Sequence, residues 1–440
     1  MVPRARVLYI AHYCRPRDAA WISTFYLLKA LKSTGLVKRA LVITNDPGAT
    51  QLKDVRELKP WTSIKYAPFS SILEMKRLGK LLRATLAYFL IFLIALKTIK
   101  EERITHIFTQ HHNYHMASFT GALMARLLGR ACIIKVQDGV PYIGRSPVEA
   151  VMNRSIMALV NKLAFKWASS ILNKSSERAF LISRAFRIPK NKMLIIPNLV
   201  DLSTFSKPNE VFRREFKKRY GLEGHKILLF IGSTLGRGLE KLLRALPKII
   251  SRIGKVKLVI LGEAGNKKAL MKLATSLGIG DCVVFAGAIE HELVSSIISL
   301  ADLCVGPLVV GWFSIADVQR KILEYMACGK PFVAAKWAVT KDLLVDGKTG
   351  IAISDPDDID ELAEKITDIL ADDERRRGLG ENARKVIEAL YDCNSPEVVS
   401  RLRRVLSSSM EMVCWPGGKP LIYRNPSFGR DGRGQADTAR

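Results

Sequence analysis

Cysteine is sparse and unpaired in this 440-residue sequence. Its seven cysteines stand singly, and none forms a Cys-x-x-Cys pair, so neither a disulfide framework nor a zinc site is indicated. We therefore expect reduced cysteines and a cytosolic compartment. The chain opens on a short apolar strand rather than on the apolar core of about 7–15 residues that marks a secretory signal, so we expect no signal peptide.

Long apolar runs are also scarce. The run ATLAYFLIFLIAL covers the 13 residues 84–96, which is shorter than the roughly 20 residues that a membrane span needs. It is flanked by Lys80 and Arg83 on one side and by Lys97 and Lys100 on the other. Two interpretations stay open: a helix buried against a sheet, or a helix that enters one leaflet with its basic ends at the headgroups.

Acidic side chains are too few to balance the basic ones. The chain has 69 Lys and Arg against 41 Asp and Glu, a net charge of +28. Residues 1–210 hold 33 basic and 12 acidic residues, a balance of +21, whereas residues 211–440 hold 36 and 29, a balance of +7. The first half therefore faces something anionic, and we expect an anionic membrane surface or a phosphorylated substrate rather than nucleic acid.

The chain alternates short apolar strands with amphipathic helices, and the pattern restarts near its middle. We expect an α/β protein of two Rossmann-like, doubly wound parallel-sheet domains, 1–198 and 199–389. A helix near 390–410 packs back on the first domain, and 411–440 forms a disordered tail. A short helix is expected over 340–347. Ligands of such sheets bind at the carboxyl ends of the strands, which places the site in the cleft between the domains.

The segment KILEYMACGKP, residues 321–331, places a carboxylate among apolar residues. Glu324 follows the start of an expected helix, whose N-terminal amides and dipole suit a diphosphate. A carboxylate one turn further along can accept hydrogen bonds from a ribose diol. The segment therefore indicates a nucleotide site.

The longer segment KILEYMACGKPFVAA resembles the donor-site signature of retaining glycosyltransferases of the GT-B fold, the large group 1 or family 4 type. IIPNLVDLSTF, LFIGSTLGRGLEKLLRAL, VVFAGAIEHELV and LLVDGKTGIAI are similar to further segments of that family, in the family's order, and the resemblance extends to about residue 405. It implies transfer of a hexose from a nucleoside-diphosphate sugar to an acceptor, with retention and without a side-chain nucleophile.

The resemblance implies roles for residues of the second domain. Glu324 matches the second acid of the family's Glu-x7-Glu motif, which holds the donor ribose. The first acid would stand at Ala316 and is absent, although Asp317 is one position away and is either a substitute or a helix cap. Arg237 aligns with the cation that neutralises the leaving diphosphate. Lys321 belongs to a Lys-x-x-Glu-Tyr pattern that one branch of the family shares. Two interpretations stay open: its cation lies near the donor diphosphate, or it is solvated.

Further site positions follow from the same resemblance. In the second domain they are Gly232 and Ser233 in the first loop, Ala288 and Ile289 where backbone groups hold the nucleotide base, and Asp342 near the donor sugar. In the first domain they are Gln137 and the catalytic candidate Asp138, which replace a family histidine, His111 on the acceptor side, and Ala19 and Ala20 in place of a glycine pair.

The expected chemistry involves no metal and no cofactor besides a UDP-, GDP- or ADP-sugar as co-substrate. The Asp-x-Asp match in 355–358 precedes a helix, where capping is the better interpretation. The expected acceptor is a glycan or lipid-linked sugar at the inner membrane face. The alternative is a non-catalytic membrane- or polyanion-binding protein on this scaffold, favoured by the missing acid and by Ser233. A sugar-nucleotide epimerase is a weaker alternative.

Overall fold

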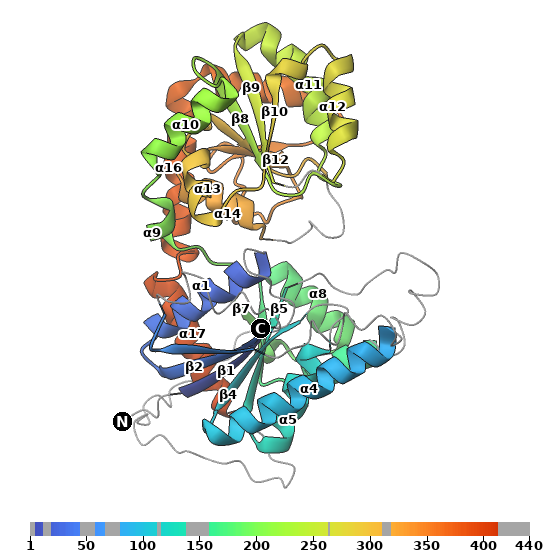
Figure 1. The fold of residues 1–440 in the computed structure, drawn as a ribbon, viewed down its shortest axis with the longest axis vertical. Helices are drawn as coiled ribbons and strands as arrows, with labels where there is room; N and C mark the ends of the chain where they lie inside the picture. Colours follow the sequence, from blue (N-terminus) through green and yellow to red (C-terminus); the bar gives the residue numbers. More distant parts are fainter. Residues whose placement is uncertain are drawn as a thin grey trace, which may run out of the picture.

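The computed structural model describes residues 5–11, 19–44, 58–66, 80–111, 116–137, 158–262, 265–309 and 318–411. These residues form two domains stacked along the long axis of the molecule, each built on a parallel sheet with helices on both faces (Figure 1). The expected architecture of two doubly wound domains is therefore confirmed.

The first domain is built on a seven-stranded sheet in the order β3-β2-β1-β4-β5-β6-β7. Its strands are β1 (Ala5–Ala11), β2 (Val37–Thr44), β3 (Thr62–Tyr66), β4 (His106–His111), β5 (Ala131–Val136), β6 (Ser170–Asn173) and β7 (Met193–Ile195). All of their pairings are parallel. The central strands are buried on both faces, which explains their near-continuous apolar sequences.

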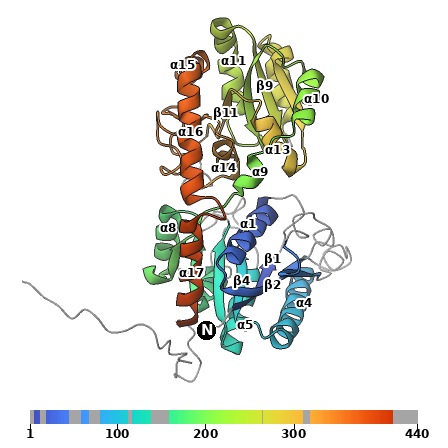
Figure 2. The same cartoon turned by 90° about the vertical axis from the view of Figure 1, so that its left-hand side faces the viewer.

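Helices cover both faces of this sheet. They are α1 (Ala19–Ser33), α4 (Lys80–Glu101), α5 (Ala117–Leu128), α7 (Ala158–Trp167), α8 (Ser176–Phe186) and, from the end of the described chain, α17 (Pro396–Glu411). Residues of α1 and α17 share one hydrophobic cluster with the sheet, and residues of α4, α5, α7 and α8 share the other. Figure 2 shows α17 beside the first domain, below α16. The last helix thus belongs to the first domain in space.

The second domain is built on a six-stranded parallel sheet in the order β10-β9-β8-β11-β12-β13. Its strands are β8 (Lys226–Ile231), β9 (Val256–Leu261), β10 (Val283–Gly287), β11 (Leu303–Val305), β12 (Phe332–Ala335) and β13 (Ile351–Ile353). Its helices are α9 (Leu202–Phe205), α10 (Glu210–Tyr220), α11 (Leu239–Ile253), α12 (Lys267–Ser276), α13 (His291–Ile298), α14 (Arg320–Ala327), α15 (Ile359–Ala371) and α16 (Asp373–Leu390).

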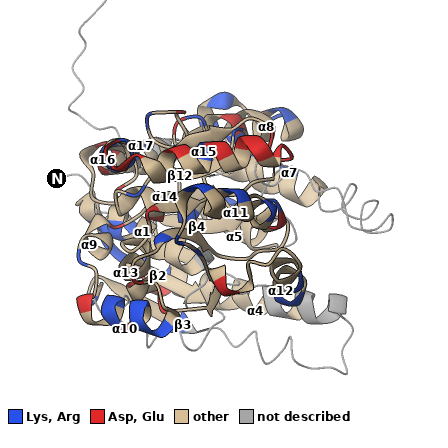
Figure 3. Cartoon of the chain, turned by 90° about the horizontal axis from the view of Figure 1, so that it is seen from above, with Lys and Arg blue, Asp and Glu red and all other residues tan. Residues whose placement is uncertain are grey.

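The two faces of the second sheet carry different helices. Residues of α13, α14 and α16 pack in one hydrophobic cluster, and residues of α11, α12 and α15 pack in the other. Basic side chains colour α10 and acidic side chains colour α15 (Figure 3). Positive charge is therefore not confined to the first domain.

The chain crosses between the domains twice, and the two crossings are bonded to each other. The amide of Val200 donates to the carbonyl of Tyr391 at 3.0 Å, and the amide of Cys393 donates to the carbonyl of Val200 at 2.8 Å. The carboxylate of Asp201 binds the ammonium of Lys29 on α1. Because a backbone pair and an ion pair meet here, this is the point where the domains are coupled.

Residues 340–347 form turns rather than the expected short helix, so that prediction was wrong. The amides of Leu343 and Leu344 both donate to the carbonyl of Thr340, at 3.0 and 3.1 Å. The hydroxyl of Thr349 then donates to the carbonyl of Leu343 at 2.6 Å, which takes the acceptor that a continuing helix would use. The chain turns at once toward β13.

Helix α4 is buried along one face, as the first of the two interpretations expects, and entry into a membrane leaflet stays a prediction. Ile91, Ala95 and Ile99 are buried in the first domain, whereas Phe89 and Leu93 are exposed. Within the described residues, no helix has the length and apolar character needed to cross a membrane.

Candidate active site

Lys321 lies in the first turn of α14 and reaches the carboxyl end of β8. Its Nζ lies 3.9 Å from the centre of the Phe230 ring. A side chain at Gly232 would place its Cβ 3.3 Å from the same nitrogen, and the φ of +103° at that glycine also disfavours any other residue. The ammonium is buried, and among the described residues no group hydrogen-bonds it. The alternative of a solvated Lys321 is therefore wrong.

The charges around Lys321 make its position favourable for an anion. Burial and the nearby positive charge of Arg237 lower the pKa of Lys321, and Glu324 opposes them, so that the pKa is about 7. Two cations that destabilise each other in the free protein are stabilised together when an anion binds between them. The diphosphate that the sequence predicts here carries such a charge.

Arg237 is held at the end of the loop that follows β8. Its carbonyl accepts the amide of Leu308 at 2.9 Å, and the next residue, Gly238, begins the approach to α11 with a φ of +78°. A Cβ at Gly238 would lie 2.9 Å from the Cβ of Leu308, so only glycine fits. The shortened loop therefore has a fixed end from which the guanidinium projects.

Glu324 is buried one turn after Lys321 and has a partner that the sequence interpretation missed. His291, the first residue of α13, donates through Nε2 to the Oε1 of Glu324 at 3.2 Å. The His291 ring lies 6.4 Å from the ring of Tyr26, on α1 of the first domain, and 5.9 Å from that of Phe205. The guanidinium of Arg320 lies 5.8 Å from the centre of the Tyr26 ring. The proposed ribose carboxylate thus sits where the domains meet.

Other donor-side candidates occupy the same edge of the second sheet, and their roles stay predictions. Ser233 and Ala288 are exposed in the loops after β8 and β10, and Ile289 is partly buried against the core. Asp342 is exposed in the turn after β12 and lines a cavity of about 410 Å³ between the domains.

The acceptor-side candidates with described side chains are engaged within the first domain. Gln137 donates to the hydroxyl of Ser23 at 3.3 Å, and its carbonyl accepts Arg178 at 3.2 Å. His111 is buried, with Nδ1 at 3.1 Å from the Ser118 hydroxyl. The acceptor roles of Gln137 and His111 stay predictions, and the structure gives both a packing role.

Four candidates receive little or no test. Asp138 and Asp317 lie outside the described residues. Ala19 and Ala20 are the first two residues of α1, at the end of the sheet where the site is expected. Their roles also stay predictions.

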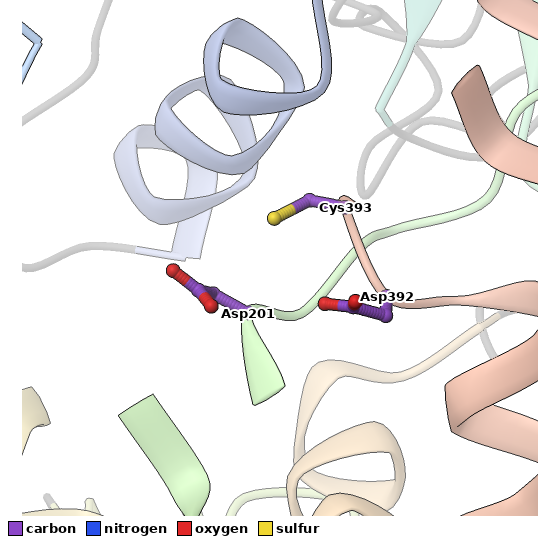
Figure 4. Close-up of side chains that lie close together, drawn as sticks. All are labelled: Asp201, Asp392 and Cys393. Carbon is purple, nitrogen blue, oxygen red and sulfur yellow. The ribbon is translucent and has the colours of Figure 1, made fainter. Parts of the chain in front are cut away.

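Neither acidic cluster has the character of a metal site. Asp358 caps α15 by accepting the amides of Asp360 and Glu361 at 2.9 Å, which confirms the capping interpretation. Asp201, Asp392 and Cys393 lie together at the domain crossing (Figure 4).

The residues of this second cluster hold the domain crossing together rather than bind an ion. Burial raises the pKa of Asp201, but its bonds from Lys29 and Ser203 outweigh burial and hold the pKa below its usual range. Burial raises the pKa of the Cys393 thiol, so it stays protonated and is a poor metal ligand. Lys29 already neutralises the carboxylate.

Two stacked domains, each built on a parallel sheet with helices on both faces, have the GT-B architecture. The chain is similar to HepE of Anabaena, solved with UDP and glucose, at a TM-score of 0.68 and 19% identity over 92% of this chain and 100% of that one. It is also similar to sucrose-phosphate synthase of Thermosynechococcus elongatus, at a TM-score of 0.69 and 19% identity over 92% and 98% of the two chains. These likenesses establish the fold.

Residues 212–386 match the family described as glycosyl transferases group 1. It is 27% identical to alpha-D-kanosaminyltransferase of Streptomyces kanamyceticus over 63% of this chain and 71% of the relative. It is 29% identical to a GDP-mannose-dependent alpha-(1-6)-phosphatidylinositol monomannoside mannosyltransferase of Mycolicibacterium smegmatis, over 42% of this chain and 49% of the relative. The chain thus spans about half the length of that mannosyltransferase.

Proposed function

We propose that this protein transfers a hexose from a nucleoside-diphosphate sugar to an acceptor, with retention of anomeric configuration and without a metal ion. The observation that carries the proposal is the buried ammonium of Lys321 beside Gly232 at the carboxyl edge of the second sheet, with the positive charge of Arg237 acting on it. The buried ammonium of Lys321 has no hydrogen-bond partner among the described residues, so an anion could bind it. Helix N-termini that face the same edge also favour negative charge.

The two cations suit the charge that develops during the reaction. When the sugar–phosphate bond breaks, negative charge grows on the diphosphate and positive charge grows at the anomeric carbon. Lys321 and Arg237 neutralise the diphosphate, which is the task a divalent metal performs in other sites. The acceptor attacks on the face that the leaving group vacates, so the mechanism needs no nucleophilic side chain. Glu324 orients the donor through its ribose.

The relatives suggest which nucleotide base and which sugar the donor carries, but they differ from one another in both. HepE binds UDP and glucose, whereas the mycobacterial relatives use GDP-mannose. We propose a UDP- or GDP-hexose in the first instance, with an ADP-hexose as the remaining option. No cofactor beyond this co-substrate is proposed.

We further propose that the acceptor is lipid-linked and reached from an anionic membrane surface, at the cytoplasmic face of the inner membrane. Phe89, Leu93 and Leu86 form an exposed apolar stripe on α4, with spacings of three, four and seven residues that place them on one helix face. Lys97 and Lys100 stand at the end of the same helix. Apolar residues beside cations suit a surface rich in anionic lipid.

The alternative is a non-catalytic binding protein on the same scaffold. The absent first acid at position 316 favours it, because a donor sugar would lose one hydrogen-bonding partner. A thermal-shift screen with UDP-, GDP- and ADP-hexoses identifies the donor, since a ligand of the folded state raises the melting temperature.

Turnover separates the two functions. Incubation of the identified donor with membrane lipid extract should release nucleoside diphosphate and form an α-linked product, which NMR of the anomeric proton identifies. Donor binding without release in the presence of every lipid fraction supports the binding protein. A β-linked product would overturn retention.

A further inference from the structure

A second charged site lies between the domains, apart from the cations that face the donor diphosphate. A cavity of about 410 Å³ is lined by residues of both domains and of the helices that join them. Its polar lining residues are Lys174, Ser175, Ser176, Thr340, Asp342, Tyr391, Arg401 and Arg404. Lys321, Arg237 and Glu324 do not line it, so the cavity is a separate feature of the cleft.

Three cations from two elements converge on this cavity. Lys174 follows β6, while Arg401 and Arg404 project from α17, one turn apart. Glu397 neutralises part of this charge, since it accepts the Nε of Arg401 at 2.7 Å, and Asp342 adds one negative charge. Among the lining residues themselves, three cations face one carboxylate, while Glu397 and Glu177 lie near the lining.

Thr340 is one of the residues that line the cavity, and its hydroxyl is buried. The residue is only 4% exposed, yet no described residue hydrogen-bonds its hydroxyl. Its carbonyl is occupied by the amides of Leu343 and Leu344, so the turn fixes the residue in place. A buried hydroxyl without a partner is costly in a folded protein unless a ligand or water completes it.

The start of α8 adds further positive character. Ser175 caps this helix by accepting the amide of Arg178 at 3.2 Å, and Ser176 is its first residue. Both serines line the cavity, so the positive end of the helix dipole faces it. Cations, a helix start and an unpartnered hydroxyl therefore surround one space.

We infer that this cavity binds an anionic group, a phosphate or a carboxylate, carried by one of the two sugar substrates. The identity of the carrier rests on the proposed function, because the cavity includes Asp342, which is expected near the donor sugar. A phosphorylated acceptor and a uronic acid share the required chemistry: oxygen atoms with negative charge on a molecule of hexose size. The apolar part of the lining, which includes Pro197, Val318 and Val405, accommodates the face of a sugar ring.

The test separates this cavity from the diphosphate site. The protein is first saturated with the nucleoside diphosphate that it binds best, which occupies Lys321 and Arg237. Inorganic phosphate, glucose 6-phosphate, glucuronate and glucose are then titrated by calorimetry. We expect the three anions to bind and glucose to bind far more weakly. The stronger of glucose 6-phosphate and glucuronate identifies the carrier as a phosphate or a carboxylate.

Three variants assign the binding to the cavity. Arg404→Gln, Arg401→Gln and Thr340→Val should each weaken the anions by about tenfold, the change expected for one hydrogen bond to a charged group. Thr340→Val keeps the shape and removes the hydroxyl alone. Arg252→Gln removes one exposed cation from α11, far in sequence from the cavity, and is the matched control. Its affinity should match that of the unmodified protein.

Two results would overturn the inference: anion affinities that the three variants leave unchanged, and equal losses in Arg252→Gln. Failure of the proposed function is a different result, since the protein would then bind no nucleoside diphosphate. In that event the phosphate titration without nucleotide still compares Arg404→Gln with Arg252→Gln, and a difference between them supports the cavity.

Discussion

The ammonium of Lys321 lies 3.9 Å from the centre of the Phe230 ring, so the start of α14 is joined to the end of β8 by a cation–π contact. This contact holds the charge beside Gly232 without neutralising it. An aromatic face contributes less than the hydration that the ammonium gives up on burial, which is why the pKa of Lys321 is lowered to about 7. The protonated form of Lys321 is therefore unfavourable in the ligand-free protein, and a bound diphosphate should stabilise it.

The first prediction is that nucleoside diphosphate binding takes up a proton above neutral pH. Lys321 loses its proton in the free protein near pH 7, and the bound diphosphate raises the pKa again. Affinity should fall by up to about tenfold per pH unit above 7. Calorimetry at pH 8 in buffers of different ionisation enthalpy measures the uptake, which Lys321→Met should abolish. Binding at pH 8 without proton uptake contradicts the assignment.

The same lowered pKa sets the sign of a stability effect. The unfolded protein binds more protons than the folded one between pH 7 and about 10, so the stability of the ligand-free protein rises with pH in this window. Lys321→Met should remove that dependence and raise the free energy of unfolding at pH 7 by about 2–4 kcal/mol. Urea unfolding at pH 7 and 9 provides the check.

The second prediction is that Arg237→Ala lowers turnover more than it lowers donor affinity. The charge that Arg237 meets grows as the leaving diphosphate forms, so kcat should fall by about 10²–10³-fold. Arg244→Ala removes an exposed cation from α11 and should leave turnover unchanged. Activity should also be indifferent to EDTA. Loss of activity in EDTA with rescue by manganese would show that a metal performs this task.

The third prediction is that Glu324 distinguishes ribose from its deoxy analogues. Glu324→Gln should weaken the ribonucleotide by about 1.5–3 kcal/mol, the range for a hydrogen bond to a charged group. It should leave the 2′,3′-dideoxy nucleotide nearly unaffected, because that ligand lacks the hydroxyls. His291→Phe should produce a smaller loss of the same kind, since His291 positions the carboxylate at 3.2 Å.

Glu292→Gln is the control for this comparison, because Glu292 is exposed on α13 next to His291. Each variant's melting temperature without ligand reports whether the fold is intact. Equal binding of the ribo- and dideoxy nucleotides by the unmodified protein would remove Glu324 from the ribose site.

Periodicity predicted the sheets and most helices because buried parallel strands and amphipathic helices leave strong local patterns. The sequence also showed Glu324 among apolar neighbours, and the structure buries it. It did not predict the bond to His291, which lies 33 residues away on another helix and is brought close only by packing. The cavity beside Thr340 was missed for the same reason, since its lining comes from segments as distant as Lys174 and Arg404.

Periodicity could not predict the shortest elements either. β6 has four residues and β7 has three, too few for a period to emerge. The turn after Thr340 contains apolar residues at spacings that fit a helix, and only the return to β13 excludes one.

The fourth prediction is that the first domain binds anionic vesicles through α4. Phe89 is 58% exposed and Leu93 is 45% exposed, and full burial of such side chains stabilises by about 1.5–3 kcal/mol each. The double variant Phe89→Ser and Leu93→Ser should therefore weaken vesicle binding by about tenfold or more. Lys97→Gln with Lys100→Gln should weaken it further, by roughly 1 kcal/mol per charge. Flotation with vesicles of known composition measures both.

The dependence on salt and on the lipid composition of the vesicles separates this binding from non-specific association of apolar side chains. Binding to anionic vesicles should fall steeply as salt rises, because screening acts within a Debye length of about 10 Å at 0.1 M. Binding to neutral vesicles should be weak at every salt concentration. Val211→Ser removes an equally exposed apolar side chain, 59% exposed on α10 of the second domain, and should change nothing. If the unmodified protein stays free of anionic vesicles even at low salt, the acceptor is a soluble molecule, and the stripe on α4 serves another contact.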